Sequence, residues 1–256
     1  MQTICWTIGA VLLLPGWQPV QQRVANAAKL EEVLARWEKA MGSLNSVSAK
    51  CSRISINNSF KLVEKYSGEV KLLKSKGPRE IWQCSLFLEK EGHPKMFDKI
   101  IWTGSQVYIF DSLNKTIVCS DRTDGKAETP VHNGPIGSLL SPRMFSLEYW
   151  LGTFVFGIDS KEAKARYEIT LVPDPRGWYH YLKLVPRTDQ DRIWVKEVRL
   201  ALNANTFLPR KMWFLRPNGD EVSWDFPQAN PNAELGPKDF AAPIPPAGWQ
   251  MKKSGD

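Results

Sequence analysis

The sequence predicts a mainly β fold of the α+β class. One strongly curved antiparallel sheet of about ten or eleven strands is expected to pack against two helices. From residue 47 onward, apolar residues recur at every second position in short runs that end at turn residues, as in antiparallel strands with one buried face. Two segments with a helical pattern accompany these runs, and a curved sheet needs such segments to fill or cover its concave face.

The composition limits the class of protein. The 256 residues are 43% hydrophobic and include 11 Trp and 11 Phe, which is typical of a globular chain with a large aromatic core. The net charge is +7, with basic and acidic residues interleaved, so we expect a solvated surface that favours anionic partners such as lipid headgroups. A nucleic-acid-binding protein would carry a clustered basic face or a known module, and we therefore expect no nucleic-acid partner.

The first 27 residues have the features of a secretory signal peptide. Residues 4–14 are an apolar run, a Pro-Gly pair follows, and Ala25-Asn26-Ala27 offers the small residues that signal peptidase recognises. The run is too short to span a bilayer, and no cysteine follows it that could be lipidated. We predict cleavage after Ala27 and export of residues 28–256 as one soluble domain. The alternative is a buried core helix.

The first predicted elements are a helix and six strands. Residues 28–45 place apolar side chains on one helical face and charged side chains on the other. Strands are then predicted at 47–52, 66–74 and 80–88, and three short strands within 98–121.

A helix and five more strands follow. A polar loop covers 123–137, and 138–157 form a helical pattern of high hydrophobicity. The sheet resumes in five runs at 166–173, 179–186, 194–202, 209–217 and 220–227. An Asn-Gly pair at 218–219 predicts a tight hairpin between the last two runs.

The chain ends on a proline-rich segment, residues 239–250. Because proline cannot donate a hydrogen bond to a neighbouring strand, such a segment belongs at a sheet edge. We expect it to close the edge, with Phe240 and Ile244 packed inward and the prolines discouraging further strand pairing.

Motifs for catalysis or metal binding are missing from the sequence. The three histidines lie far apart, and no nucleophile elbow, phosphate-binding loop or dinucleotide-binding glycine pattern is present. We therefore predict a protein that is not an enzyme and needs no metal or cofactor. After the signal, Cys51, Cys84 and Cys119 are expected to be buried in strands, and one disulfide between two of them is the alternative.

The excess of apolar side chains on one face of the predicted sheet has two interpretations. The face forms either an ordinary hydrophobic core or an apolar cavity of the kind that lipid carriers use. The pattern alone does not separate them.

The order of elements and several short motifs resemble the periplasmic lipoprotein carrier (LolA-like) family and the wider group of outer-membrane lipoprotein-sorting proteins. The resemblance spans about residues 28–250. It is carried by the N-terminal helix with Trp37, SGEVKLLK to REIW (67–82), KIIWTGSQVYIFDSLNKTI (99–117), PIGSLL (135–140) and the closing run from LALNANTFLPRKMWF to PKDFAAPIPPAGW (200–249).

The resemblance implies an open, incomplete antiparallel β-barrel, or half-barrel, with helices over its concave face. It implies a periplasmic, monomeric carrier or chaperone that holds the acyl chains of a lipid or an acylated lipoprotein during sorting and transport. Its partners would include inner- and outer-membrane lipoprotein-handling proteins. The alternatives are an envelope sensor or regulatory binding module of the same fold, or a small-molecule enzyme that uses the cavity.

The resemblance and the facing pattern predict nine residues that line an acyl-chain cavity. They are Trp82, Leu86, Trp102, Phe110, Trp224 and Phe226 from strands, and Leu140, Met144 and Phe145 from the central helix. In the family, an Arg followed directly by Pro ends a strand and latches the lid. Here Lys74 stands nearest that position, and residues 75–77 separate it from Pro78. Because Lys lacks the forked donors of Arg, Lys74 is a predicted latch position that departs from the family.

Overall fold

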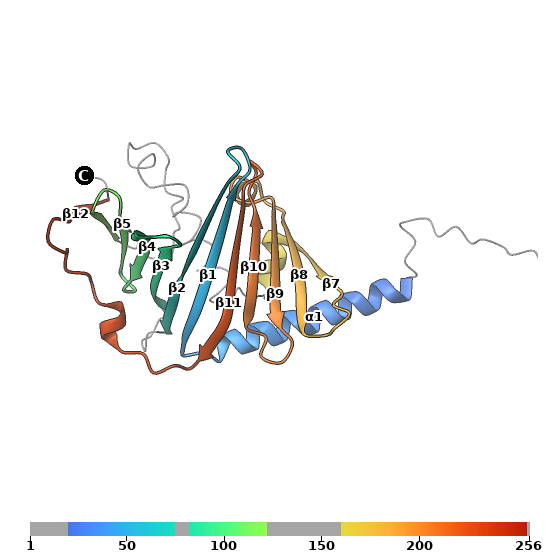
Figure 1. Ribbon diagram of the computed structural model, residues 1–256. Helices are drawn as coiled ribbons and strands as arrows, with labels where there is room; N and C mark the ends of the chain where they lie inside the picture. The colour runs from blue at the N-terminus through green and yellow to red at the C-terminus, as the bar shows by residue number, and fades with distance from the viewer. Residues whose placement is uncertain (1–19, 75–81, 122–159, 255–256) are drawn as a thin grey trace, which may run out of the picture.

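The computed structural model describes residues 20–74, 82–121 and 160–254 of the chain, and the side chains from residue 26 onward (Figure 1). The helices are α1 (Val20–Gly42), α3 (Ser160–Arg166), α4 (Asp189–Arg192) and the 3₁₀ helix η2 (Pro237–Phe240). The strands are β1 (Ser46–Asn57), β2 (Leu62–Lys74), β3 (Trp82–Lys90), β4 (His93–Trp102), β5 (Gln106–Asp111), β6 (Thr116–Asp121), β7 (Tyr167–Val172), β8 (Tyr179–Pro186), β9 (Glu197–Asn203), β10 (Pro209–Leu215), β11 (Glu221–Pro231) and β12 (Gln250–Lys253).

All twelve described strands form one sheet in the order β12-β6-β5-β4-β3-β2-β1-β11-β10-β9-β8-β7. Neighbouring strands are antiparallel except β12 and β6, which are parallel. Because β12 and β7 lie at opposite ends of this order, the sheet is open. The predicted class, an open antiparallel half-barrel, is confirmed. The structure adds a twelfth strand, β12, to the eleven strand runs read from the sequence.

The helix α1 covers the concave face of the sheet at the β7 end. Its apolar side chains belong to the same buried cluster as alternate residues of the strands, and they are Val33, Leu34, Trp37, Met41 and Leu44. The helix begins at Val20, earlier than predicted, because residues 20–27 contain no helix breaker. It therefore includes Ala27, and cleavage after this residue stays a prediction. The predicted central helix lies outside the described residues.

A second apolar cluster lies on the convex face near the β12 edge. It consists of Ile101, Tyr108, Phe110, Ile117 and Cys119, with Phe97 and Trp249 packed against it. The indole of Trp249 stacks on Phe97 with 5.9 Å between ring centroids and meets Phe110 edge-on at the same distance. The C-terminal segment thus covers apolar side chains that the other described strands leave on the outer face.

The predicted closing edge is partly right. Phe240 is buried, with 1% of its surface exposed, and the segment does reach an edge of the sheet. Ile244 is 91% exposed, so the prediction that it packs inward is wrong. The prolines also do not end strand pairing, because the backbone after Trp249 pairs with β6 through Gln250 to Lys253. Trp249 takes the anchoring role that was assigned to Ile244.

We expect Trp249→Ala to lower the free energy of unfolding by about 2 kcal/mol, because the half-buried indole loses both ring contacts. Urea denaturation monitored by circular dichroism measures the change. Ile244→Ala is the matched control in the same segment and should change stability by less than about 0.5 kcal/mol. Equal effects of the two substitutions would show that Trp249 does not anchor the segment.

Candidate functional site

The concave face of the sheet brings together five of the nine predicted cavity residues. Leu86, Trp224 and Phe226 are buried in its main cluster, and Trp82 and Trp102 are half-buried against the same cluster. These five occupy β3, β4 and β11, which are separated by β1 and β2 in the sheet order. The five residues therefore lie on the same face of the sheet, but at least two strands separate those on β3 and β4 from those on β11.

The other four predicted residues have different outcomes. Phe110 points to the convex face, where it contacts Trp249, so its assignment to the concave cavity is wrong. Both faces of β5 are apolar, and the alternating pattern therefore did not decide which face is concave. Leu140, Met144 and Phe145 lie outside the described residues.

Lys74 is the last residue of β2 and stands opposite Trp82 in the β2–β3 register. It is half-buried at the border of the concave face. Its role as a latch stays a prediction.

Sequence reasoning missed a polar row on the concave face. The registers align Trp224 of β11, Arg53 of β1, Tyr66 of β2 and Lys90 of β3 across four neighbouring strands. Arg53 is 3% exposed and lies between two rings, with its guanidinium carbon 4.1 Å from the Tyr66 centroid and 5.7 Å from the Trp224 centroid. The signal was present, because Arg53 continues the buried alternation of Val47, Ala49 and Cys51.

Arg53 is tied to Asp98 of β4. One terminal nitrogen donates to Oδ2 of Asp98 at 2.5 Å, and this pair bridges β1 to β4 across β2 and β3. Gly68 of β2 lies beside the strand positions that this ion pair crosses. It is in register with Cys51 of β1 on one side and Leu88 of β3 on the other. A Cβ atom at Gly68 would come within 1.9 Å of the Phe87 carbonyl oxygen, so glycine is required for the close approach of β2 and β3 there.

The polar row contains a buried hydrogen-bond donor without an acceptor among the described residues. Nε of Arg53 is buried and has no hydrogen-bond partner within the described part of the chain. Burial raises the pKa of the neighbouring Tyr66 phenol, and the carboxylates of Asp98 and Glu64 raise it further. A tyrosine phenol is protonated at neutral pH and this shift acts in the same direction, so the Tyr66 hydroxyl is a hydrogen-bond donor.

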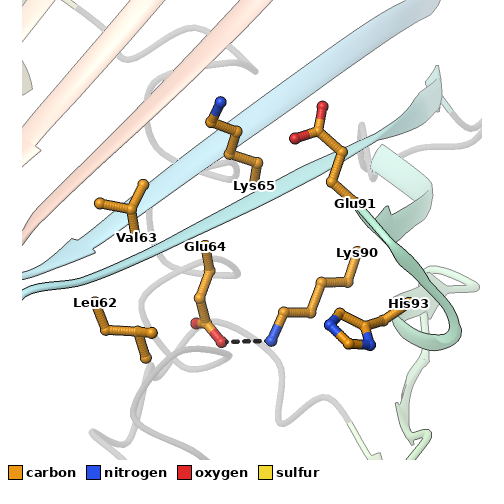
Figure 2. A pocket seen from close by; sticks show the side chains of 7 residues that line it. All are labelled: Leu62, Val63, Glu64, Lys65, Lys90, Glu91 and His93. Carbon is orange, nitrogen blue, oxygen red and sulfur yellow. Dashed lines mark hydrogen bonds and ion pairs between the residues drawn. The ribbon is translucent and has the colours of Figure 1, made fainter.

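A pocket of about 400 Å³ opens near the Lys90 end of this row. Figure 2 shows the residues that line it, which are Leu62, Val63, Glu64, Lys65, Lys90, Glu91 and His93. Nζ of Lys90 lies 2.9 Å from Oε1 of Glu64, and their side chains are 19% and 7% exposed. Glu64, Lys90 and His93 point to one side of β2, whereas Lys65 points to the other (Figure 2).

The described residues contain no group of three or more His, Cys, Asp or Glu side chains that could hold a metal ion. Within the same residues, none of the helices is both long and apolar enough to cross a membrane. Cys51, Cys84 and Cys119 are buried free thiols, which agrees with their predicted placement in strands.

No protein-family model matches the sequence, and no curated protein matches it. Structures of similar fold include Pseudomonas aeruginosa MucB in complex with MucA, at 15% identity over 84% of this chain and 61% of that chain, with a TM-score of 0.43. MucB alone matches at 15% identity over 85% of this chain and 64% of that chain, with a TM-score of 0.47. This chain thus spans less than two thirds of the MucB chains.

A LolA superfamily protein from Nitrosomonas europaea matches at 12% identity over 83% of this chain and 97% of that chain, with a TM-score of 0.35. The likeness concerns the fold, an open antiparallel sheet with a helix over its concave face.

We expect Arg53→Met and Asp98→Leu each to lower the free energy of unfolding by about 3 kcal/mol, because either change leaves one charge of a largely buried pair without its partner. The double variant should lose less than the sum of the two single losses. Urea denaturation of all four proteins measures the coupling. Additive losses would mean that the pair does not hold β1 to β4.

Burial raises the pKa of the Cys51 thiol to about 12. The thiolate is the reactive form, so iodoacetamide at pH 8 should leave Cys51 unmodified in the folded protein and alkylate it in urea. Peptide mapping by mass spectrometry measures both. Rapid alkylation of Cys51 in the folded protein would contradict this environment.

Proposed function

We propose that the protein binds the acyl chains of a lipid or an acylated lipoprotein on its concave face and carries them across the periplasm. The observation that carries this proposal is the combination of an extended apolar face with a polar row at one place on it. An amphiphile has the same two parts, a hydrocarbon chain and a polar headgroup.

The apolar part of the site would supply most of the affinity. Each CH₂ group removed from water contributes about 0.8 kcal/mol, so a chain of ordinary length gains several kcal/mol even when it is only partly covered. Trp82 and Trp102 are half-buried at the border of the face and offer large apolar surfaces to an entering chain.

The polar row would orient the ligand. Nε of Arg53 and the hydroxyl of Tyr66 are donors that suit a carbonyl, carboxylate or phosphate oxygen. Binding such an oxygen would satisfy a buried donor, and a ligand without a polar end would leave it unsatisfied. The site therefore favours amphiphiles over plain hydrocarbons.

We expect the double variant Trp82→Ala/Trp102→Ala to bind dansyl-labelled undecanoic acid at least about tenfold more weakly than the wild type, because a loss of about 1.4 kcal/mol corresponds to that factor. The increase in dansyl fluorescence on titration gives Kd. Trp213→Ala is the matched control, since Trp213 is also half-buried but lies on the convex face, where its Nε1 donates to Glu221. Its Kd should be unchanged.

Native mass spectrometry of the protein purified from an envelope fraction provides the second test. Retained lipid or acylated peptide supports a carrier. Absence of dansyl-acid binding together with absence of retained lipid would contradict the proposal. Retention of an unmodified protein alone would favour the alternative, a regulatory binding module.

A further inference from the structure

The hairpin that joins β1 and β2 projects beyond its neighbours on one side. β1 and β2 remain paired up to Asn57 and Leu62, whereas β3 begins to pair with β2 only at Tyr66 and Lys90. The end of the β1–β2 hairpin, residues 58–63, therefore extends past the last β2–β3 pair, and its loop stands at one end of the sheet (Figure 1). We call residues 58–63 the hairpin tip.

The hairpin tip exposes three large apolar side chains within four residues. Phe60 is 82% exposed, Leu62 47% and Val63 52%. Single exposed apolar residues are ordinary on protein surfaces, but three within four residues at the end of a projecting hairpin are not. Leu62 and Val63 point to opposite sides of β2, so the apolar side chains surround the end of the hairpin (Figure 2). Such a group needs an apolar environment that a projecting loop can enter.

Local hydrogen bonds hold the hairpin tip in shape. The Phe60 amide donates to Oδ1 of Asn57 at 2.9 Å. The Asn58 amide donates to Oδ1 of Asp220 at 3.0 Å, and its side-chain nitrogen donates to the Gly219 carbonyl at 2.6 Å. These bonds tie the tip to the β10–β11 turn. Phe60 is therefore presented outward by an ordered turn, and burying it elsewhere requires no reordering of the loop.

The surroundings of the hairpin tip are basic. Lys61 and Lys65 are exposed on the hairpin itself. Lys95 is exposed on β4, which β3 separates from this hairpin in the sheet. Among the nearby carboxylates, Glu64 pairs with Lys90 and Asp220 accepts from the Asn58 amide. Glu91 is exposed on the same side of the strands as Lys65, and the two lysines outnumber it (Figure 2). The apolar side chains are thus flanked by cationic groups, which is the arrangement that anionic lipid headgroups attract.

We infer that the hairpin tip docks on the surface of a bilayer that contains anionic phospholipids. Phe60 and Leu62 enter the boundary between headgroups and acyl chains, while Lys61 and Lys65 lie against lipid phosphates. Docking this end would also bring the pocket beside Glu64 and Lys90 close to the bilayer. A lipid could then pass from the bilayer through this pocket toward the concave face. This path rests on the proposed function, whereas the docking of the hairpin tip does not.

Vesicle flotation tests the inference. The full chain is incubated at low salt with vesicles of phosphatidylcholine alone or of phosphatidylcholine mixed with phosphatidylglycerol. The wild type should float with the mixed vesicles and much less with phosphatidylcholine alone. Phe60→Ala should weaken partitioning about tenfold. Lys61→Gln and Lys65→Gln should each weaken it about fivefold, and added salt should remove the lysine effect.

Ile244→Ala is the matched control, because Ile244 is 91% exposed but lies in the C-terminal segment far along the chain. Its partitioning should equal that of the wild type. The apolar run at residues 4–14 is common to all variants, so differences between variants report the hairpin tip. Equal partitioning of Phe60→Ala and Ile244→Ala, or no preference of the wild type for anionic vesicles, would overturn the inference.

Binding of dansyl-labelled undecanoic acid separates this inference from the proposed function. Phe60→Ala should retain the wild-type Kd, since Phe60 lies outside the concave cluster. Loss of dansyl-acid binding in the wild type with vesicle docking intact would defeat the proposed function alone. Dansyl-acid binding without vesicle docking would defeat the hairpin-tip inference alone.

Discussion

The ion pair between Arg53 and Asp98 is the interaction on which the arrangement of β1 to β4 depends. A guanidinium on β1 reaches a carboxylate on β4, across two intervening strands, on a face whose buried residues are mostly apolar. The contact requires the sheet to curl inward, and Gly68 permits the close strand approach at that place. Because an unpaired charge in this position is costly, the pair favours the curled arrangement over a flatter sheet.

The same curl separates two chemical environments. On the inside, α1 and alternate strand residues form the main cluster, with the polar row of Trp224, Arg53, Tyr66 and Lys90 crossing it. On the outside, the described apolar side chains near the β12 edge are covered by Trp249 from the end of the chain. The C-terminal segment thus covers part of the outer face, while α1 packs against the main cluster on the inner face.

The alternation of apolar and polar residues predicted where the strands lie and, for most of them, which side chains face the core. It could not predict side-chain contacts between strands that are not neighbours. Trp224 was placed on the concave face because Ser223 and Asp225 beside it are polar, and Leu86 because it alternates with Gln83 and Ser85 along its strand. Phe110 was misplaced because both faces of β5 are apolar, and only the distant Trp249 shows which one is outside. The partnership of Arg53 with Asp98 depends on curvature, which no local pattern encodes.

Photocrosslinking tests most directly whether the concave face is a lipid-binding surface. The folded protein is irradiated with a diazirine-labelled long-chain fatty acid, and the modified peptides are mapped by mass spectrometry. Modification should concentrate on concave-face residues such as Trp82 and Trp102 and be reduced by unlabelled fatty acid. Modification confined to the convex cluster around Phe110 and Trp249, or none that unlabelled fatty acid competes away, would contradict the account.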